Sequence, residues 1–438
     1  MIHLQRAREL RIKRANTDWW INEKAIVADN GLTYIAYVTD MGEIHVKELD
    51  AKCSRSRSRD RRLCKLNYLY ADEHNAPSMC ILESGRIFVG YTGHYVHELR
   101  YRITEKPYDI DSFGEERTLP FDGTVTYVQI FENTKKKELW LFTRVNNVNW
   151  EFRYSRDEGQ SWSTPKRFLH SEDGGLFYLN VRKQHVALEA AVDEQFFFAL
   201  YGHPRISKDH VIRSGIFSSD GRLLRTNGTP LGLSLYGEDD GQIDLAALDT
   251  VYSSPAGTTV RLLDVSPTLP LRVGFAPFVL DKADAPSPEH AYYMSATFKD
   301  GRWITSKPIC SAGEFLAKGI LDGSQTYLGG MAYYYGVGNA GLRPGADNYV
   351  KTLTDRIYIA RFDGERRVLE SYLSRDGGES YLLEQKIRVI EEKDVKIWRP
   401  TVPIHAQDNM PLYWHEGIYG AHTGGWHCDE VMLVEYDD

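Results

Sequence analysis

Two histidines stand at the ends of one predicted hairpin, in the sequence ADEHNAPSMCILESGRIFVGYTGH at residues 71–94. His74 and Asn75 come just before an apolar run, and His94 follows the next run, 20 residues after His74. An imidazole titrates near neutral pH, so it can give or take a proton in catalysis. A strand, a Ser-Gly turn and a returning strand would bring both histidines to one edge of a sheet. The alternative is that His74 caps a turn before Pro77 and that His94 is an exposed loop residue.

Two later segments also place polar side chains where an apolar strand begins or ends: TYVQIFENTKKKELWLFTRVNNVNW at residues 126–150 and LYGHPRI at residues 200–206. An arginine after an apolar run such as LWLFT needs an acidic partner or a ligand, so Arg144 indicates a structural ion pair or an anion site. Tyr127 has a plainer alternative, because a buried tyrosine is common in a core. The candidate residues of these segments are Tyr127, Arg144, Asn149, Trp150, Tyr201, His203 and Arg205.

Most of the segments that must position these residues have the sequence pattern of β-strands. Short apolar or alternating runs, such as GLTYIAYV at residues 31–38 and EQFFFALYG at residues 194–202, recur between clusters of Gly, Asn, Asp and Pro. Alternation of apolar and polar residues, interrupted by regularly spaced turn residues, predicts an all-β protein. The regular recurrence of hairpins favours a radial repeat. Counting the modules predicts a seven-bladed β-propeller that forms a single catalytic domain over residues 1–438, with the site on loops around the central funnel.

Two turns carry a more specific marker. SRDEGQSW at residues 155–162 and SRDGGESY at residues 374–381 resemble the Asp-box turns of sialidase-type propellers. In such a turn the aspartate accepts hydrogen bonds from backbone N–H groups, the glycine adopts a positive φ, and the aromatic residue packs back on the blade. The motif therefore identifies blades and not chemistry. These residues are Asp157, Gly159 and Trp162 in the first turn and Asp376, Gly378 and Tyr381 in the second.

Composition excludes several classes of protein. The chain is 42% hydrophobic and 12% aromatic, which suffices for a large core, and it contains no apolar run long enough to cross a bilayer. A net charge of −8 argues against a general nucleic-acid binder. The five cysteines are scattered and include no CxxC pair, so they predict neither a disulfide framework nor a compact metal motif.

The last module, YWHEGIYGAHTGGWHCDE at residues 413–430, is rich in side chains that bind metals. Imidazole and thiolate groups suit zinc, although their spacing here matches no compact zinc finger. The module is a candidate site for a structural zinc, and the plainer interpretation is a polar closing blade without metal. The four expected ligands are His415, His422, His427 and Cys428.

Three segments together resemble a known family: residues 72–94, WWINEKAIVADNGLTYIAYV at residues 19–38 and WRPTVP at residues 398–403. They look like the BNR-4 type of repeat proteins, which includes ulvan lyases, lyases that remove rhamnose from glucuronate, and a related rhamnosidase. The resemblance extends over nearly the whole chain, and HNAP and YTGH are its most specific parts. It implies a catalytic site made of His74, His94, Tyr127 and Arg144, with Arg205 as a weaker match. From their chemistry and position, the residues that could bind the acidic sugar in neighbouring subsites are Asn75, Asn149, Trp150, Tyr201, His203 and Arg205.

The reaction that the resemblance implies is β-elimination at a uronate. The carboxylate must be neutralised to stabilise the enolate-like intermediate, a base must take the C5 proton, and an acid must protonate the departing O4. Arg144 suits neutralisation because its planar fork binds a carboxylate and stays charged. His74 suits the base, and Tyr127 suits the acid or both proton transfers. This scheme needs no cofactor.

Three other functions compete with a lyase. A rhamnosidase on the same scaffold is the main enzymatic alternative, a carbohydrate-binding propeller without catalysis is another, and a sialidase is disfavoured because YRITEKP at residues 101–107 lacks the Arg-Ile-Pro motif. The expected partner is an acidic polysaccharide or oligosaccharide, with no nucleic acid and no membrane, and the chain is expected to be a monomer. The resemblance implies secretion or a periplasmic location, while the absence of a visible signal peptide leaves the cytoplasm open.

Overall fold

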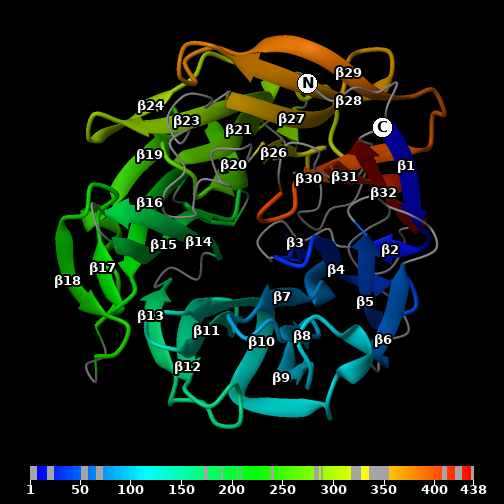
Figure 1. Cartoon of the computed structure of the whole chain (residues 1–438). Coiled ribbons are helices and arrows are strands. Elements are labelled where there is room, and N and C mark those ends of the chain that lie inside the picture. The colour runs from blue at the N-terminus through cyan, green and yellow to red at the C-terminus, as the bar shows by residue number, and fades with distance from the viewer. Residues whose placement is uncertain are drawn as a thin grey trace.

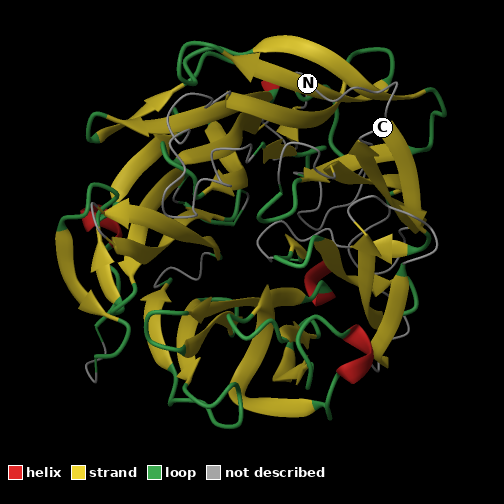
Figure 2. Cartoon of the chain, viewed as in Figure 1, coloured by secondary structure: helices red, strands yellow, loops and turns green. Residues whose placement is uncertain are grey.

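The chain folds into antiparallel sheets arranged radially around a common axis, which is a β-propeller arrangement (Figure 1). The structure is a computed structural model that describes residues 7–16, 24–50, 58–65, 73–171, 176–188, 191–204, 206–208, 210–237, 241–280, 286–287, 290–316, 327–334, 355–406, 412–419 and 427–435. Strands dominate these residues, so the expectation of an all-β protein is confirmed (Figure 2). The described helices are three single 3₁₀ turns, η3 (Glu73–Asn75), η4 (Ile110–Ser112) and η5 (Leu245–Ala247). Within the described residues no helix could cross a membrane.

The first half of the chain forms three sheets. One contains β2 (Ala15–Asn16), β3 (Ala25–Val27), β4 (Leu32–Thr39), β5 (Glu43–Asp50) and β6 (Arg59–Lys65). The next contains β7 (Ser78–Ile81), β8 (Ile87–Thr92), β9 (Val96–Ile103), β10 (Arg117–Asn133), β11 (Glu138–Val145), β12 (Asn149–Ser155) and β13 (Lys166–His170). The third contains β14 (Phe177–Leu188), β15 (Ala191–Gly202), β16 (Val211–Ser218), β17 (Arg222–Leu224), β18 (Pro230–Ser234) and β19 (Asp249–Ser253).

The second half completes the ring with three more sheets. One contains β20 (Thr258–Ser266), β21 (Arg272–Leu280), β22 (Pro286–Ser287), β23 (Tyr292–Lys299), β24 (Arg302–Thr305) and β25 (Cys310–Ser311). The next contains β26 (Met331–Tyr333), β27 (Asp355–Phe362), β28 (Arg367–Ser374) and β29 (Leu382–Ile390). The last contains β30 (Lys396–Thr401), β31 (Leu412–Ile418), β32 (His427–Glu435) and β1 (Ala7–Ile12).

The two ends of the chain close the ring within one sheet. β1 pairs antiparallel with β32, from Ala7 opposite Glu435 to Ile12 opposite Glu430 (Figure 1). A strand from the start of the chain thus completes the sheet formed by its end, and this pairing ties the first and last parts of the ring together. The assignment of residues 1–438 to a single domain stays a prediction.

The described strands form six hydrogen-bonded sheets, so the predicted count of seven separate blades is wrong. The difference arises at β10, a strand of 17 residues. Its first part pairs with β9, from Arg117 opposite Tyr101, and its later part pairs with β11, ending at Asn133 opposite Glu138. Two modules that the sequence counts separately are therefore joined in one seven-stranded sheet.

Both marked turns have the local geometry expected from their sequence. Asp157 accepts a hydrogen bond from the backbone N–H of Ser161 at 2.8 Å, and Asp376 accepts one from Ser380 at 2.9 Å. Gly159 has a φ of 79°, in the left-handed region that a residue without Cβ adopts at little cost. Gly378 likewise has a positive φ, of 94°. The aromatic residues of the two turns pack as expected, Trp162 against one core cluster and Tyr381 within another.

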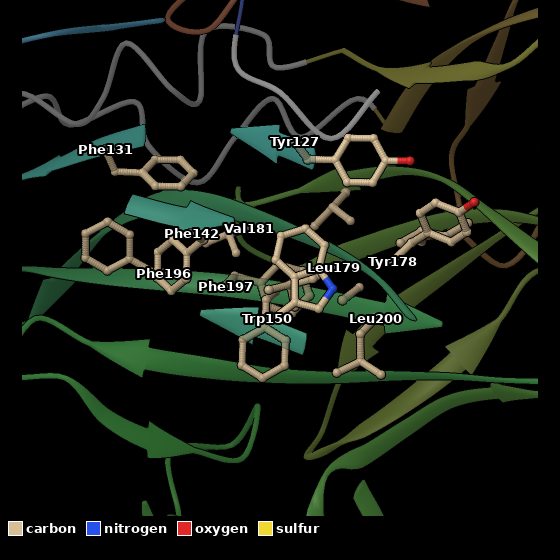
Figure 3. Close-up of a cluster of buried hydrophobic side chains, with 14 of the residues drawn as sticks. Tyr127, Phe131, Phe142, Trp150, Tyr178, Leu179, Val181, Phe196, Phe197 and Leu200 are labelled. Atoms are coloured by element: carbon tan, nitrogen blue, oxygen red, sulfur yellow. The ribbon is translucent and has the colours of Figure 1, made fainter. Parts of the chain in front are cut away.

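Some strands are buried along their whole length because neighbouring structure covers both of their faces. All eight residues of β11, ELWLFTRV, are buried, and they include Arg144. Aromatic side chains of β10, β11, β14 and β15 pack together between neighbouring sheets (Figure 3). Gln129 of β10 joins two sheets, since its amide donates to the Leu179 carbonyl at 2.9 Å and accepts from the Val181 N–H at 2.8 Å. This packing fixes the strand ends that carry the candidate site.

Candidate active site

The two histidines of the first hairpin meet face to face. His74 lies in η3, immediately before β7, and His94 follows the end of β8. Their ring centroids are 3.9 Å apart with an interplanar angle of 12°. Tyr95 extends the stack on the other side of His94, with a centroid separation of 3.9 Å. The expected return of the hairpin to one edge is therefore confirmed for the two imidazoles.

Tyr127 joins this pair from the neighbouring part of the same sheet. Its ring centroid lies 5.4 Å from that of His74, and the two planes differ by 23°. The residue has a φ of 67° and lies within a register shift of β10 between Thr126 and Gln129. A positive φ is strained for a residue with a bulky side chain, and β-bulges redirect side chains near functional sites. The strain at Tyr127 therefore supports a functional reason for its orientation.

Arg144 contacts the ring of the same tyrosine. Its guanidinium carbon lies 4.4 Å from the centroid of the Tyr127 ring, and the residue is 2% exposed. Nη2 donates to Oδ1 of Asn147 at 3.4 Å, while Nε and Nη1 have no hydrogen-bond partner among the described residues. Within that part of the chain Arg144 forms no ion pair, so a structural ion pair does not account for it there. A buried guanidinium with open donors is suited to an incoming carboxylate.

Tyr178 completes the site and was not singled out as a functional residue from the sequence. It lies at the start of β14, with its ring centroid 6.2 Å from Tyr127 and 5.5 Å from the guanidinium carbon of Arg144. Figure 3 shows Tyr127 and Tyr178 at one end of the aromatic cluster, with their hydroxyl groups directed away from Phe131, Phe142 and Phe196. The sequence feature that could have identified Tyr178 is a tyrosine at the beginning of an apolar run, as for Tyr127.

The third segment extends the same cluster of buried rings. Tyr201 stacks on Tyr178 with centroids 5.3 Å apart, and the His203 ring lies 5.8 Å from Tyr178. Burial raises the pKa of the Tyr201 phenol, and the nearby charges of Arg261, Arg399 and Arg144 act in the opposite direction. Two of these arginines, on β20 and β30, were not identified from the sequence. Arg205, predicted in the same segment, lies outside the described residues.

Of three other predicted residues, Trp150 and Asn149 form hydrogen bonds within the protein, and Asn75 is buried. Trp150 is buried, donates from Nε1 to the Phe177 carbonyl at 3.0 Å, and supports the Tyr127 ring at a centroid separation of 6.3 Å. Asn149 shares a 2.6 Å hydrogen bond between its Oδ1 and Nδ1 of His170. Asn75 is 1% exposed, and its Oδ1 has no described hydrogen-bond partner. Substrate contacts by all three stay predictions.

The predicted zinc ligands are only partly described. His415 is buried in β31 and stacks on Trp398 at a centroid separation of 5.4 Å. The Cys428 thiol in β32 donates to the carbonyl of Ala15 at 3.3 Å. His422 and the side chain of His427 lie outside the described part of the structure, and the described residues contain no group of three or more metal-binding side chains. Two donors fall short of the four that a structural zinc needs, so the zinc stays a prediction.

Comparisons with known sequences point to one family. Residues 32–197, which carry His74, His94, Tyr127 and Arg144, match the BNR repeat-containing family. An ulvan lyase from Alteromonas sp. (strain LOR) is 28% identical over 115 residues, which are 22% of this chain and 23% of that protein. The chain thus aligns with about a quarter of the length of this curated relative. The expected resemblance to BNR-4 type proteins is confirmed.

Solved structures show the same fold over nearly the whole chain. A PL25 ulvan lyase matches with a TM-score of 0.69 at 13% identity, covering 98% of this chain and 96% of the other. A structure of such a lyase bound to -[GlcA(1-4)Rha3S]- matches with a TM-score of 0.68 at the same identity and the same coverage. The polysaccharide lyase Uly1 matches with a TM-score of 0.55 at 12% identity, covering 95% and 90% of the two chains. At these identities the likeness establishes the propeller architecture alone.

Proposed function

Starting from the match of residues 32–197 to the BNR repeat-containing family, we propose that this protein is a polysaccharide lyase that cleaves an acidic glycan by β-elimination at a uronate. One observation carries the proposal: His94, His74 and Tyr127 form a continuous stack, and the Arg144 guanidinium lies 4.4 Å from the Tyr127 ring centroid. This arrangement places two kinds of proton-transfer group beside a cation that has open donors.

Arg144 supplies the electrostatic part of the reaction. The substrate carboxylate accepts hydrogen bonds from its Nε and Nη1, which have no described partner in the free protein. Neutralising that carboxylate stabilises the negative charge that develops when C5 loses its proton. Because the guanidinium is buried, its interaction with a carboxylate is stronger than it would be in water. Arg144 contributes most when the charge on the substrate is greatest, in the transition state.

The proton transfers fall to His74 and Tyr127. One takes the proton from C5, the electron pair of that C–H bond forms the C4–C5 double bond, and the C4–O4 bond breaks. The departing O4 receives a proton from the Tyr127 phenol. We propose His74 as the base and Tyr127 as the acid, with His94 holding the His74 ring in place through the stack.

Hydrolysis on the same scaffold is the main rival. Glycoside hydrolases commonly use two carboxylic acids that flank the scissile bond. The four groups assembled here are two imidazoles, a phenol and a guanidinium, which match the needs of elimination better than those of hydrolysis. The printed ligand of one structural relative contains glucuronate and a rhamnose sulfate, and we propose a rhamnose- and glucuronate-containing glycan as substrate. A polymeric substrate would place the enzyme outside the cell or in the periplasm.

One assay separates the candidate functions. The protein is incubated with ulvan, and the ultraviolet absorbance of an unsaturated uronate is followed while free rhamnose is measured in parallel. A rise in absorbance supports the lyase. Free rhamnose without the rise supports a rhamnosidase, and binding of the glycan without either product supports a carbohydrate-binding propeller. Either of these last two results would overturn the proposed elimination.

A further inference from the structure

Tyr95 forms the outer end of the ring stack that contains the two histidines. It lies in the turn between β8 and β9, directly after His94, and its ring centroid is 3.9 Å from that of His94 with an interplanar angle of 20°. His74 lies on the other face of His94, and Tyr127 follows His74 in the stack. Tyr127 is fully buried and His74 is 6% exposed, whereas Tyr95 is 48% exposed. The stack therefore begins in the interior, at Tyr127, and ends at the surface, at Tyr95.

The exposed part of Tyr95 includes an open aromatic face. One face of its ring is covered by the His94 imidazole at a centroid separation of 3.9 Å. The exposed area of the side chain therefore lies on the opposite face and along the ring edge. A flat face of this kind can pack against the apolar surface of a ligand that reaches the stack from solvent.

The backbone at Tyr95 is strained for a residue of this size. Its φ is 61°, in the left-handed region that is uncommon for bulky side chains and in which asparagine is enriched. Burial of the ring offsets only part of this cost, because nearly half of the residue stays exposed. Strained residues cluster at active sites and at segments that hold ligands. The strain therefore supports a functional reason for an aromatic side chain at this position, as it does for Tyr127.

The pairing of β8, β9 and β10 holds the turn that carries Tyr95. The Thr92 hydroxyl at the end of β8 donates to the Glu98 carbonyl in β9 at 2.8 Å. Val96, the residue after Tyr95, pairs with β10 at the position two residues before Tyr127. The Tyr95 ring is therefore held at a fixed place relative to Tyr127. An aromatic side chain that is already in place loses little conformational entropy when it binds a ligand.

We propose that Tyr95 is an aromatic platform that binds a 6-deoxyhexose of the glycan, next to the uronate at which elimination occurs; this inference rests on the proposed function. The face of an aromatic ring is electron-rich, so it attracts the C–H groups on the apolar side of a pyranose and repels a carboxylate. A 6-deoxyhexose carries a methyl group in place of a polar substituent, which makes it the better partner for that face.

The order of rings in the stack places this sugar beside the reacting one. The uronate carboxylate needs Arg144, whose guanidinium lies over Tyr127 at the buried end of the stack. Two imidazole rings separate Tyr127 from Tyr95. The two tyrosines therefore contact neighbouring sugars, and Tyr95 takes no part in proton transfer.

The alternative role for Tyr95 is to hold the His94 ring, and Tyr95→Asn separates the two roles. Asparagine tolerates a positive φ, so this variant should fold while losing the ring. A contact with a sugar that does not react is equally strong before and in the transition state, so its loss raises KM and not kcat. We expect KM for ulvan to rise by about 3–10-fold and kcat to change by less than about twofold, with Tyr95→Phe restoring most of the affinity. A fall in kcat at unchanged KM would overturn the platform.

Binding without turnover tests the platform apart from the lyase reaction. In calorimetry with ulvan oligosaccharides, adding Tyr95→Asn to the Tyr127→Phe protein should raise Kd by about 3–10-fold. The matched control is Tyr292→Asn, at a tyrosine that is 39% exposed on β23 in another sheet, and it should leave Kd unchanged. An unchanged Kd after Tyr95→Asn would overturn the proposal.

Saturation-transfer NMR with the same oligosaccharides identifies the sugar that the platform binds. The methyl protons of rhamnose should receive strong saturation from the Tyr127→Phe protein, and Tyr95→Asn should weaken their signal more than the signals of the uronate. Equal weakening of both sugars would overturn the assignment to a 6-deoxyhexose. If the unaltered protein forms no unsaturated uronate, the lyase proposal fails, while weaker glycan binding after Tyr95→Asn would still support the platform.

Discussion

The guanidinium of Arg144 lies over the ring of Tyr127, 4.4 Å from its centroid, although the two residues come from successive strands of the sheet. In the strand register Arg144 stands opposite Thr126, the residue before Tyr127. The shift in β10 after Thr126 and the positive φ of Tyr127 turn the phenol toward the cation. This contact links the group that would bind a carboxylate to a group that would transfer a proton.

Removing only the phenol hydroxyl tests the proton-transfer role. Tyr127→Phe keeps the ring that stacks with His74 and supports Arg144, so its Tm should lie close to that of the unaltered protein. Loss of a positioned acid or base costs about 10²–10⁴-fold in rate, and we expect kcat for formation of the unsaturated uronate to fall by that factor. A Tyr127→Phe protein that keeps a near-normal kcat would contradict the assigned role.

Replacing the guanidinium of Arg144 by an ammonium group tests whether Arg144 neutralises the substrate carboxylate. Arg144→Lys keeps one positive charge but loses bidentate hydrogen bonding, so kcat/KM should fall by about 10²–10³-fold. The matched control is Arg153→Lys on the adjacent strand β12, where the guanidinium lies over Phe121 at 4.5 Å and away from the stack. That control should keep kcat/KM. Equal losses in both variants would show a general effect on the fold.

The buried carboxyl of Asp264 predicts a pH-dependent difference in stability. Its pKa is raised to about 6, above the value of an unfolded aspartate, because burial disfavours its charge. The protonated form therefore favours folding, and that contribution is full below about pH 4 and lost as the pH rises through about 6. Asp264→Asn should stabilise the protein at pH 8 by at most about 3 kcal/mol and by about half as much at pH 5. Urea unfolding at both pH values measures this, and a gain that grows toward acid would contradict it.

The side chain of Gln129 is expected to stabilise the fold and to take no part in catalysis. Gln129→Leu would leave the Leu179 carbonyl and the Val181 N–H buried without their partner. Each unsatisfied group costs about 1–3 kcal/mol, so we expect a loss of about 2–5 kcal/mol in the free energy of unfolding. Gln160→Leu, at an exposed turn position, is the control and should change stability by less than about 0.5 kcal/mol. A neutral Gln129→Leu would show that the two sheets do not depend on this bond.

The predicted structural zinc is checked by elemental analysis of the purified protein. We expect one zinc ion per chain, held by His415 together with ligands from the last module, and a lower Tm after treatment with a chelator. His415→Ala should lose the metal, while a change at His170, which pairs with Asn149 elsewhere in the ring, should keep it. A zinc content well below one ion per chain would contradict the predicted structural zinc.

Local patterns were enough to predict the elements and several of the site residues. Alternation and turn residues predicted the strands, and the two Asp-containing turns form the expected hydrogen bonds. The hairpin of residues 71–94 predicted that His74 and His94 return to the same edge, because one strand out and one strand back fixes that geometry within a single segment. The count of blades failed, because the pairing of β10 with both β9 and β11 depends on long-range hydrogen bonds that no local pattern records.

The sequence by itself determined an all-β chain and the set of chemical groups that it offers, since period-two alternation and residue type are local properties. Only the tertiary structure decided which groups meet. The bulge at Tyr127 directs its ring toward Arg144, Tyr178 enters from another sheet, and Trp150 is turned inward to the Phe177 carbonyl. Lys24, Arg182, Asp264 and Arg399 are likewise far apart in the sequence, and the fold brings them to the lining of one cavity. Closing a ring of sheets brings distant strand ends together around one axis, and that proximity is not encoded in any one segment.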